Sequence, residues 1–258
     1  MRARQATPAV LRAAFTDAAA RRTAFWTQIA AMVVNDVAWV LFWLIFFHRV
    51  GTVRGWDTHQ VLLLFAVLTT SAGLVLGLLS NCRRIPATVQ SGALDEVLAL
   101  PVHPLRHLLV RRIDTINLGD VAFGVVLFVV AAHPTPQHVL VYVVGSLASA
   151  VLLTGFLVLT GSLSFFVGRG EASDLSLHSV LLLASYPADV FTGATKALLY
   201  SAVPAAFVSA VPARLIDDFD VVDALVLVGA AGVFAVLGWS VFTLGLRRYT
   251  SGSAWGRG

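Results

Sequence analysis

Acidic and amide side chains inside apolar stretches are the residues of this chain whose chemistry calls for an explanation. Asn35 and Asp36 lie near the middle of one apolar run, and Asp114, Asn117 and Asp120 lie in another. The last three are spaced i, i+3 and i+6, which predicts that they share one face of a helix. A charge in the middle of a membrane is costly, so each of these side chains must face protein or water.

Two kinds of chemistry fit such residues. They could line a polar translocation path or an ion relay, or they could form ion pairs and water-linked contacts between neighbouring helices. Asp114 lies beside Arg111 and Arg112, which favours the ion-pair interpretation there. For Asp36 and Asp120 both interpretations stay open, and we expect Asp36 to pair with an arginine or a polar group on a neighbouring helix.

Motifs for catalysis or nucleotide binding are not found. There is no H-E-x-x-H zinc motif and no G-x-x-x-x-G-K-[ST] phosphate loop, since the glycine spacing at Gly193–Lys196 is wrong. Gly161–Ser164 lacks the second glycine of a G-x-S-x-G elbow. A single cysteine, Cys82, excludes an intrachain disulfide. We expect no catalytic residue, no metal and no cofactor bound by this chain itself.

The composition indicates which elements position these residues. Hydrophobic residues make up 58% of the 258 residues and charged residues only 12%, against roughly 25% charged in a soluble domain. Several apolar runs reach the roughly 20 residues that a membrane-spanning helix needs. The sequence therefore predicts an all-α polytopic membrane protein, with residues 1–258 forming a single transmembrane domain.

Six spans are expected, at about residues 25–47, 60–80, 113–132, 139–167, from 176 onward, and 221–246. Fourteen arginines then fall on one side of the membrane and three on the other, which predicts cytoplasmic N- and C-termini. Residues 1–24 are expected to form an amphipathic helix in the cytoplasmic interface. The net charge of +4 indicates contact with anionic membrane lipid and no nucleic-acid partner.

The fifth apolar region is too long for one straight crossing. As a single helix, residues 176–211 would measure about 54 Å, against a hydrocarbon core of about 30 Å. We expect one kinked crossing followed by a re-entrant hairpin, with residues 203–220 forming the hairpin and loop on the outer side. The same region contains Asp189 and Lys196, to which both interpretations of buried charge apply. The residues expected at its kink and turns are Tyr186, Pro187, Pro204 and Pro212.

A basic segment between the second and third spans, residues 83–112, offers a cytoplasmic surface. Apolar residues recur at helical spacing, which predicts an amphipathic helix parallel to the membrane. Pro86 suits its first turn and Pro101 ends it, while Gly92 loosens the middle. Its polar face could dock into the groove of a partner protein; the alternative is a helix lying on lipid with no partner. The apolar ridge consists of Ile85, Val89, Ala93 and Val97, widened by Leu94 and Leu98.

Three patches resemble one family. Residues 90–95 (QSGALD) and 98–101 (LALP) are similar to the "G-x-L-D…L-x-x-P" cytoplasmic segment of the membrane subunits of type-2 ATP-binding-cassette exporters, in a bacterial branch once catalogued as permeases of unknown function. Many relatives carry a basic residue where this chain has Leu100. The other patches are Tyr186-Pro187 with residues 203–208 and 212–213, and the ending at residues 245–252.

The resemblance implies a six-span permease with an interfacial N-terminal helix, a cytoplasmic coupling helix and a re-entrant segment before the last span. It further implies a bacterial cytoplasmic membrane location and a dimer with a second permease copy or a paralogue. A separate nucleotide-binding ATPase subunit would hold ATP and Mg²⁺ and drive the permease. The residues assigned to coupling are Ser91, Gly92, Leu94, Asp95, Leu98 and Pro101.

Two other functions compete with this one. An ion-coupled secondary transporter usually has broken helices in both halves, whereas only the fifth region is broken here. A passive membrane scaffold would show no dependence on ATP or on residues 92–95. The substrate is not encoded in any pattern of the sequence.

Overall fold

The computed structural model describes residues 22–114, 116–167 and 171–249. Within these ranges every regular element is a helix, apart from an isolated bridge between Val53 and Trp56. The all-α prediction is therefore confirmed. The expected interfacial helix over residues 1–24 lies almost entirely outside the described residues.

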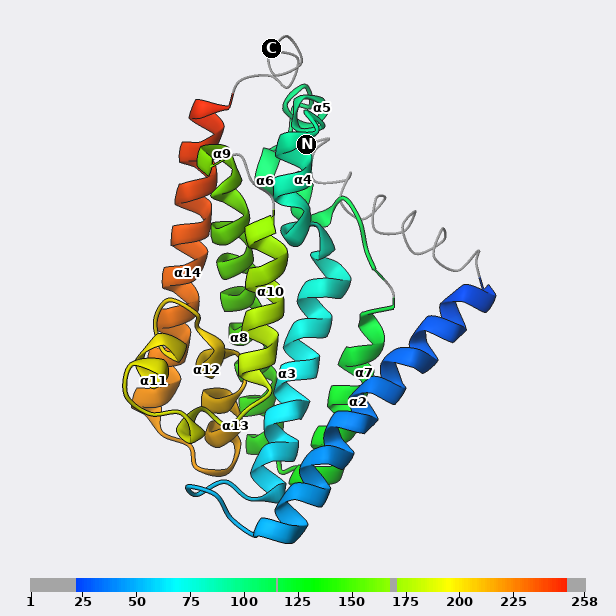
Figure 1. Ribbon diagram of the computed structural model, residues 1–258, viewed down its shortest axis with the longest axis vertical. Helices are drawn as coiled ribbons and strands as arrows, with labels where there is room; N and C mark the ends of the chain where they lie inside the picture. The colour runs from blue at the N-terminus through cyan, green and yellow to red at the C-terminus, as the bar shows by residue number, and fades with distance from the viewer. Residues whose placement is uncertain (1–21, 115, 168–170, 250–258) are drawn as a thin grey trace.

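Long apolar helices form the body of the molecule. In the described part of the chain, four helices are long and apolar enough to cross a membrane, and two shorter apolar helices accompany them. Figure 1 shows them running lengthwise, with α2 leaning away from the others. The four are α2 (Arg22–Val50), α3 (Thr58–Leu78), α8 (Pro136–Ser162), which α9 (Ser164–Val167) continues, and α14 (Val221–Arg248). The shorter two are α7 (Leu118–Ala132) and α10 (Glu171–Ala184).

Short helices gather toward the two ends of this bundle (Figure 1). We call these the α5 end and the α13 end. The α5 end contains the 3₁₀ helix η1 (Ser80–Arg84), α4 (Ile85–Gln90), α5 (Leu94–Leu98) and α6 (Pro104–Val110). Toward the α13 end lie the 3₁₀ helix η2 (Ala188–Val190), α11 (Gly193–Leu199), α12 (Ala205–Val208) and α13 (Ala210–Asp217).

Helix α3 is the centre of the bundle. Of its most apolar stretch, 78% is buried, whereas the corresponding figures are 11% for α2 and 22% for α14. The carboxylate of Asp57 caps its first turn by accepting a 2.9 Å hydrogen bond from the backbone N–H of Gln60. Helices α2 and α14 therefore present most of their apolar surface to the outside of the chain.

Glycines bring the backbones of neighbouring helices into contact. A Cβ atom on Gly155 of α8 would lie 2.5 Å from the carbonyl carbon of Phe234 in α14, and one on Gly238 would lie 2.6 Å from the carbonyl oxygen of Gly155. On the other side of the core, a Cβ on Gly73 of α3 would lie 2.8 Å from the carbonyl oxygen of Asn117. Helices α3, α7, α8 and α14 are thus locked together through positions that accept no side chain.

The third span differs from the prediction. Helix α7 begins at Leu118, with Asn117 as its N-cap residue, so Asp114 lies outside the helix, whereas Asn117 and Asp120 both lie against Gly73 of α3. The backbone N–H of Asp114 donates to the carbonyl of Gly77 at 2.8 Å, and its carboxylate accepts from the N–H of Ile116 at 3.2 Å. A side chain that bonds its own local backbone in this way replaces a helical turn.

The fifth region also differs in detail. Helix α10 ends at Ala184 and the chain does not continue as a helix beyond a kink at Tyr186-Pro187, because the residue before a proline is disfavoured in the α conformation. The carbonyl of Ala184 accepts a 2.5 Å hydrogen bond from the hydroxyl of Ser209. Helices η2, α11, α12 and α13 follow, so short helices begin at residue 188 and not at the expected residue 203.

Replacing Gly155 by alanine should loosen the contact between α8 and α14. The added methyl meets backbone atoms that cannot rotate away, so we expect a destabilisation of about 1–3 kcal/mol, seen as a lower thermal midpoint of the purified protein. Gly232→Ala is the matched control, because a Cβ there meets nothing within 4 Å. Equal midpoints for the two variants would contradict the close approach of these helices.

Candidate functional site

The expected coupling helix is two short helices. Helix α4 ends at Gln90 and α5 begins at Leu94, with Gly92 between them at φ +75°. This left-handed conformation costs an L-residue roughly 1–2 kcal/mol, so glycine is the residue suited to the break. Figure 1 shows α5 almost end-on, so that it lies across the long axis of the bundle.

Buried apolar side chains hold this segment onto the long helices. Ile85 packs over Gly161 of α8, where an added Cβ would lie 3.3 Å from the Cβ of Ile85. Leu94 is fully buried and Val97 is 1% exposed, and both belong to the same core as Leu105 of α6. Leu94, which the sequence placed on the apolar ridge and among the coupling residues, is therefore an anchor inside the protein.

The opposite side of the segment is open. Ser91, Leu98 and Pro101 are exposed, and Gly92 and Asp95 are partly exposed. Leu98 is 43% exposed, although the apolar ridge predicted it on the inner face. The α4–α5 segment thus combines a rigidly anchored inner face with a mixed apolar and acidic outer face, which is the kind of surface that a partner protein can grip.

A second group of predicted residues lies between α2 and α7. The carboxyl groups of Asp36 and Asp120 lie close to each other, and the side-chain amide of Asn35 donates to Asp36 at 3.4 Å. One oxygen of each carboxyl group, Oδ2 of Asp36 and Oδ1 of Asp120, is buried without a hydrogen-bond partner. Two adjacent carboxyl groups can share a single proton. Asn117 and Asp114 lie on the turn before α7 and approach α3 through their backbone. The functional roles of these residues stay predictions.

A charged cluster at the α13 end centres on Asp189. Its carboxylate accepts from the ammonium of Lys196 at 2.7 Å and from the indole N–H of fully buried Trp56 at 3.0 Å, and it also pairs with Arg214. The guanidinium of Arg214 lies 4.9 Å from the ring centroid of Trp56. Arg54 donates to the backbone carbonyl of Asp189 at 3.0 Å.

This Asp189 cluster ties four parts of the chain together. It joins the loop between α2 and α3 to η2, α11 and α13. Nearby, His59 Nε2 lies 3.0 Å from the carboxylate of Asp217, which links α3 to α13 a second time. Burial by itself would raise the pKa of the Asp189 carboxyl, but the hydrogen bonds from Lys196 and Trp56 and the positive charge of Arg214 outweigh it and hold the pKa below its usual value.

Sequence reasoning identified Asp189 and Lys196 but missed their partners. Arg54, Trp56 and Arg214 are separated from them by loops and helix ends, so no local spacing connects them. One signal was present: Arg54 and Arg214 are two of the three arginines on the arginine-poor side, where a positive charge needs a local partner. Among the described residues, no group of three or more His, Cys, Asp or Glu side chains could hold a metal ion.

Replacing Asp189 by asparagine should destabilise the α13 end. The substitution leaves two cations and an indole N–H around a neutral side chain. We therefore expect the free energy of unfolding to fall by about 1–3 kcal/mol, measured as a lower thermal midpoint in nanodiscs. Asp218→Asn, an exposed acid at the same end, is the control and should change little.

The same pair of variants tests the pH dependence. Because the folded-state pKa of Asp189 is lowered, the unfolded chain binds more protons between the two pKa values. The stabilisation is therefore present above the ordinary value of 3.8 and is lost as pH falls through the folded-state pKa. In the wild-type protein the thermal midpoint should fall at acid pH for this reason, and Asp189→Asn should make that fall smaller. An equal fall in both proteins would contradict the stabilising role of the Asp189 carboxylate.

Comparison with known proteins adds one finding to this geometry. The model of the family described as ABC-2 family transporter protein matches residues 33–253. That range includes most of α2, all of the other long helices, the α4–α5 segment and the Asp189 cluster. Searches of curated proteins and of solved structures found no match. Because the family match extends over most of the sequence, the chain belongs to the ABC-2 family of transporter proteins and is a membrane permease component of an ATP-binding-cassette transporter.

Proposed function

We propose that this permease belongs to an exporter driven by a separate ATPase subunit, which grips the outer face of the α4–α5 segment. The observation that carries the proposal is the two-sided construction of that segment. Leu94 and Val97 are buried on one side, while Leu98 is exposed on the other. A segment held this firmly transmits a push from its outer face to the helices beneath it.

The route of that push follows from the packing. Ile85 rests on Gly161 near the end of α8, and α6 leads through Arg111–Asn117 into α7. A displacement of the α4–α5 segment would therefore reach α8 through α4, and α7 through α6 and the chain that follows it. ATP and Mg²⁺ belong to the partner, and this permease contributes the helices that move.

The proposed topology has six crossings with both termini in the cytoplasm of a bacterial cell. Helices α7 and α10 are 15 and 14 residues long, or about 22 Å, and each forms a short crossing in this proposal. Arginines concentrate at the α5 end, which supports its cytoplasmic placement; they are Arg83, Arg84, Arg106, Arg111, Arg112, Arg247 and Arg248.

A second copy or a paralogous permease completes the transporter in this proposal. Helices α2 and α14 are the least buried of the long helices, and their exposed apolar side chains face either lipid or that second subunit. The translocation path would then lie between the two permeases.

An ion-coupled secondary transporter is the second candidate, and the proximity of Asp36 and Asp120 is what favours it. Such a carrier needs no ATPase and would lose transport on Asp36→Asn even when no partner is present. Recovery of an ATPase with the permease separates the two candidates.

Leu98→Asp should uncouple the permease from its ATPase. The substitution puts a charge into the centre of the proposed docking face without touching the buried anchors. After mild-detergent purification from the native host, we expect at least about tenfold less ATPase activity in the eluate, equivalent to ~1.4 kcal/mol of binding. Phe219→Asp, the same kind of change at an exposed position of the α13 end, should retain it. Full ATPase recovery with Leu98→Asp would contradict the docking assignment.

Cysteine labelling in whole cells tests the topology. Burial raises the pKa of the Cys82 thiol to about 12, so it should stay unlabelled, and Cys82→Ser gives a clean background. A membrane-impermeant maleimide should label Thr52→Cys, Pro134→Cys and Asp218→Cys from outside, and Ser91→Cys only after permeabilisation. Labelling of Pro134→Cys from inside would show that α7 does not cross.

A further inference from the structure

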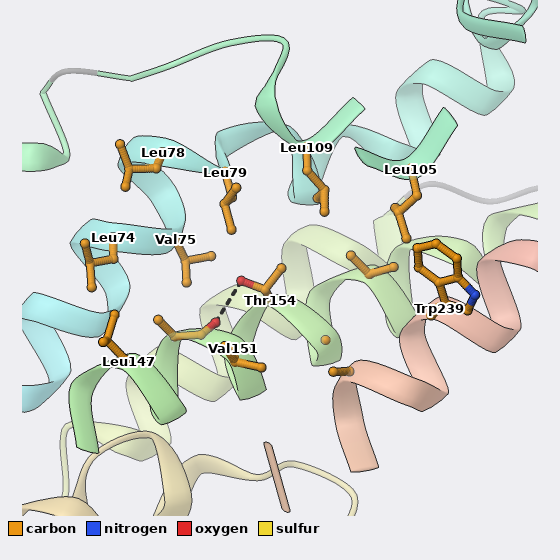
Figure 2. A pocket seen from close by; sticks show the side chains of 14 residues that line it. Leu74, Val75, Leu78, Leu79, Leu105, Leu109, Leu147, Val151, Thr154 and Trp239 are labelled. Carbon is orange, nitrogen blue, oxygen red and sulfur yellow. Dashed lines mark hydrogen bonds between the residues drawn. The ribbon is translucent and has the colours of Figure 1, made fainter. Parts of the chain in front are cut away.

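An apolar pocket opens on the side of the bundle near the α5 end. It has a volume of about 400 Å³, within the range of about 300–1,000 Å³ typical of ligand sites. Figure 2 shows its walls coming from α3, α6, α8 and α14. The side chains that shape it most are Leu74, Leu105, Leu109, Leu147, Val151 and Trp239.

The lining of this pocket offers a polar ligand little beyond the indole N–H of Trp239. Thr154 carries the only side-chain hydroxyl in it, and that hydroxyl donates to the carbonyl of Ala150 at 2.7 Å. Val151 and Trp239 are each about half exposed, at 49% and 48%. The pocket is therefore reached from the surroundings of the bundle and suits a flexible hydrocarbon.

The position of the pocket along the helices corresponds to one leaflet of the membrane. Trp239 lies eight residues before Arg247 on α14, which is about 12 Å along the helix. The hydrocarbon of one leaflet is about 15 Å thick, half of the whole core. If the arginines at the end of α14 mark the cytoplasmic side, the pocket faces the cytoplasmic leaflet, and the edge of the pocket that Trp239 and His103 form lies toward the headgroups.

Two polar side chains, those of His103 and Arg106, lie at the start of α6 next to residues of the pocket. The imidazole of His103 stacks on the Trp239 ring, with centroids 4.4 Å apart and planes 23° from parallel. Arg106 is exposed on α6 directly after the pocket residue Leu105. Moving an acyl chain from lipid into an apolar pocket gains no hydrophobic free energy, since both surroundings are apolar. Selective binding must therefore come from fit and from headgroup charge.

We propose that this pocket binds one acyl chain of an anionic phospholipid from the cytoplasmic leaflet, with its phosphate held by Arg106 beside His103. The inference rests on the proposed orientation of the permease. It does not require an ATPase, because the pocket is formed within one chain. Since Leu105 and Leu109 come from α6, the lipid would also contact the helix that follows the α4–α5 segment.

Photocrosslinking tests the proposal directly. The probe is a phosphatidylglycerol with a diazirine near the end of one acyl chain, present at low mole fraction in phosphatidylcholine nanodiscs that contain the purified full chain. Mass spectrometry should find adducts concentrated on the α8 and α14 walls of the pocket. Unlabelled phosphatidylglycerol should compete for them several-fold better than phosphatidylcholine with the same chains.

Variants make the test specific. Ala150→Phe fills the pocket and should lower the adduct yield several-fold, and Leu109→Phe fills it from the α6 side should the first variant fold poorly. Arg106→Gln should lower the yield by removing the headgroup charge. Val144→Phe is the control, because Val144 is 49% exposed on α8 outside the pocket.

Three results would overturn the proposal. Adducts spread evenly along α8, including the surroundings of Val144, would show that the probe reacts from the bulk lipid and does not bind in the pocket. Equal competition by phosphatidylcholine would show that the anionic headgroup does not contribute to binding. Absence of adducts, with crosslinks between two permease copies at the same site, would show that a second subunit covers the pocket. Failure to recover an ATPase leaves the lipid measurement intact, so the two proposals fail separately.

Discussion

The constraint on which this structure depends is that backbone N–H and C=O groups in an apolar environment must find partners within the protein. Long helices satisfy it internally, but α10 ends inside the bundle and exposes its last carbonyls. The hydroxyl of Ser209 reaches back to the carbonyl of Ala184, and the hydroxyl of Ser149 on α8 donates to the carbonyl of Phe207 at 2.9 Å. Both serines are fully buried. Two side chains thus permit the short helices from α11 to α13 to exist beside the long ones.

The two ends of the bundle are held by different forces. At the α13 end, the Asp189 cluster joins four segments through ion pairs and hydrogen bonds to a carboxylate that is only 16% exposed. At the α5 end, the α4–α5 segment is attached through apolar side chains, of which Leu94 and Val97 are the most buried. Apolar contacts have no preferred direction, so the segment can move as a unit together with the helices beneath it, whereas the charge cluster has one satisfied hydrogen-bonding geometry. We infer that the α13 end is the fixed end of the permease and the α5 end the one that responds to a partner.

Residue pattern predicted the class and the long helices, because hydrophobic runs of span length allow few alternatives in a membrane. It failed where tertiary contacts decide. Asp114 looks helical by spacing, yet its bond to the carbonyl of Gly77 holds it in a turn. Leu98 follows the apolar ridge, yet the break at Gly92 rotates α5 so that Leu98 faces out. The partners of Asp189 are more than 130 residues away for Arg54 and Trp56, and no periodicity reports such a contact.

Helix α6 is the place where the two proposals meet. One face of it supplies Leu105 and Leu109 to the apolar pocket, and the chain enters it directly from the α4–α5 segment. If docking of an ATPase shifts α6, the width of the pocket changes with it. Linkage then requires the reverse effect: an acyl chain that binds one position of α6 more tightly must change the affinity for the ATPase by the same factor. A lipid that fitted both positions equally would shift nothing, however tightly it bound. The composition of the cytoplasmic leaflet therefore becomes a regulator of coupling only to the extent that the α6 wall differs between the two positions.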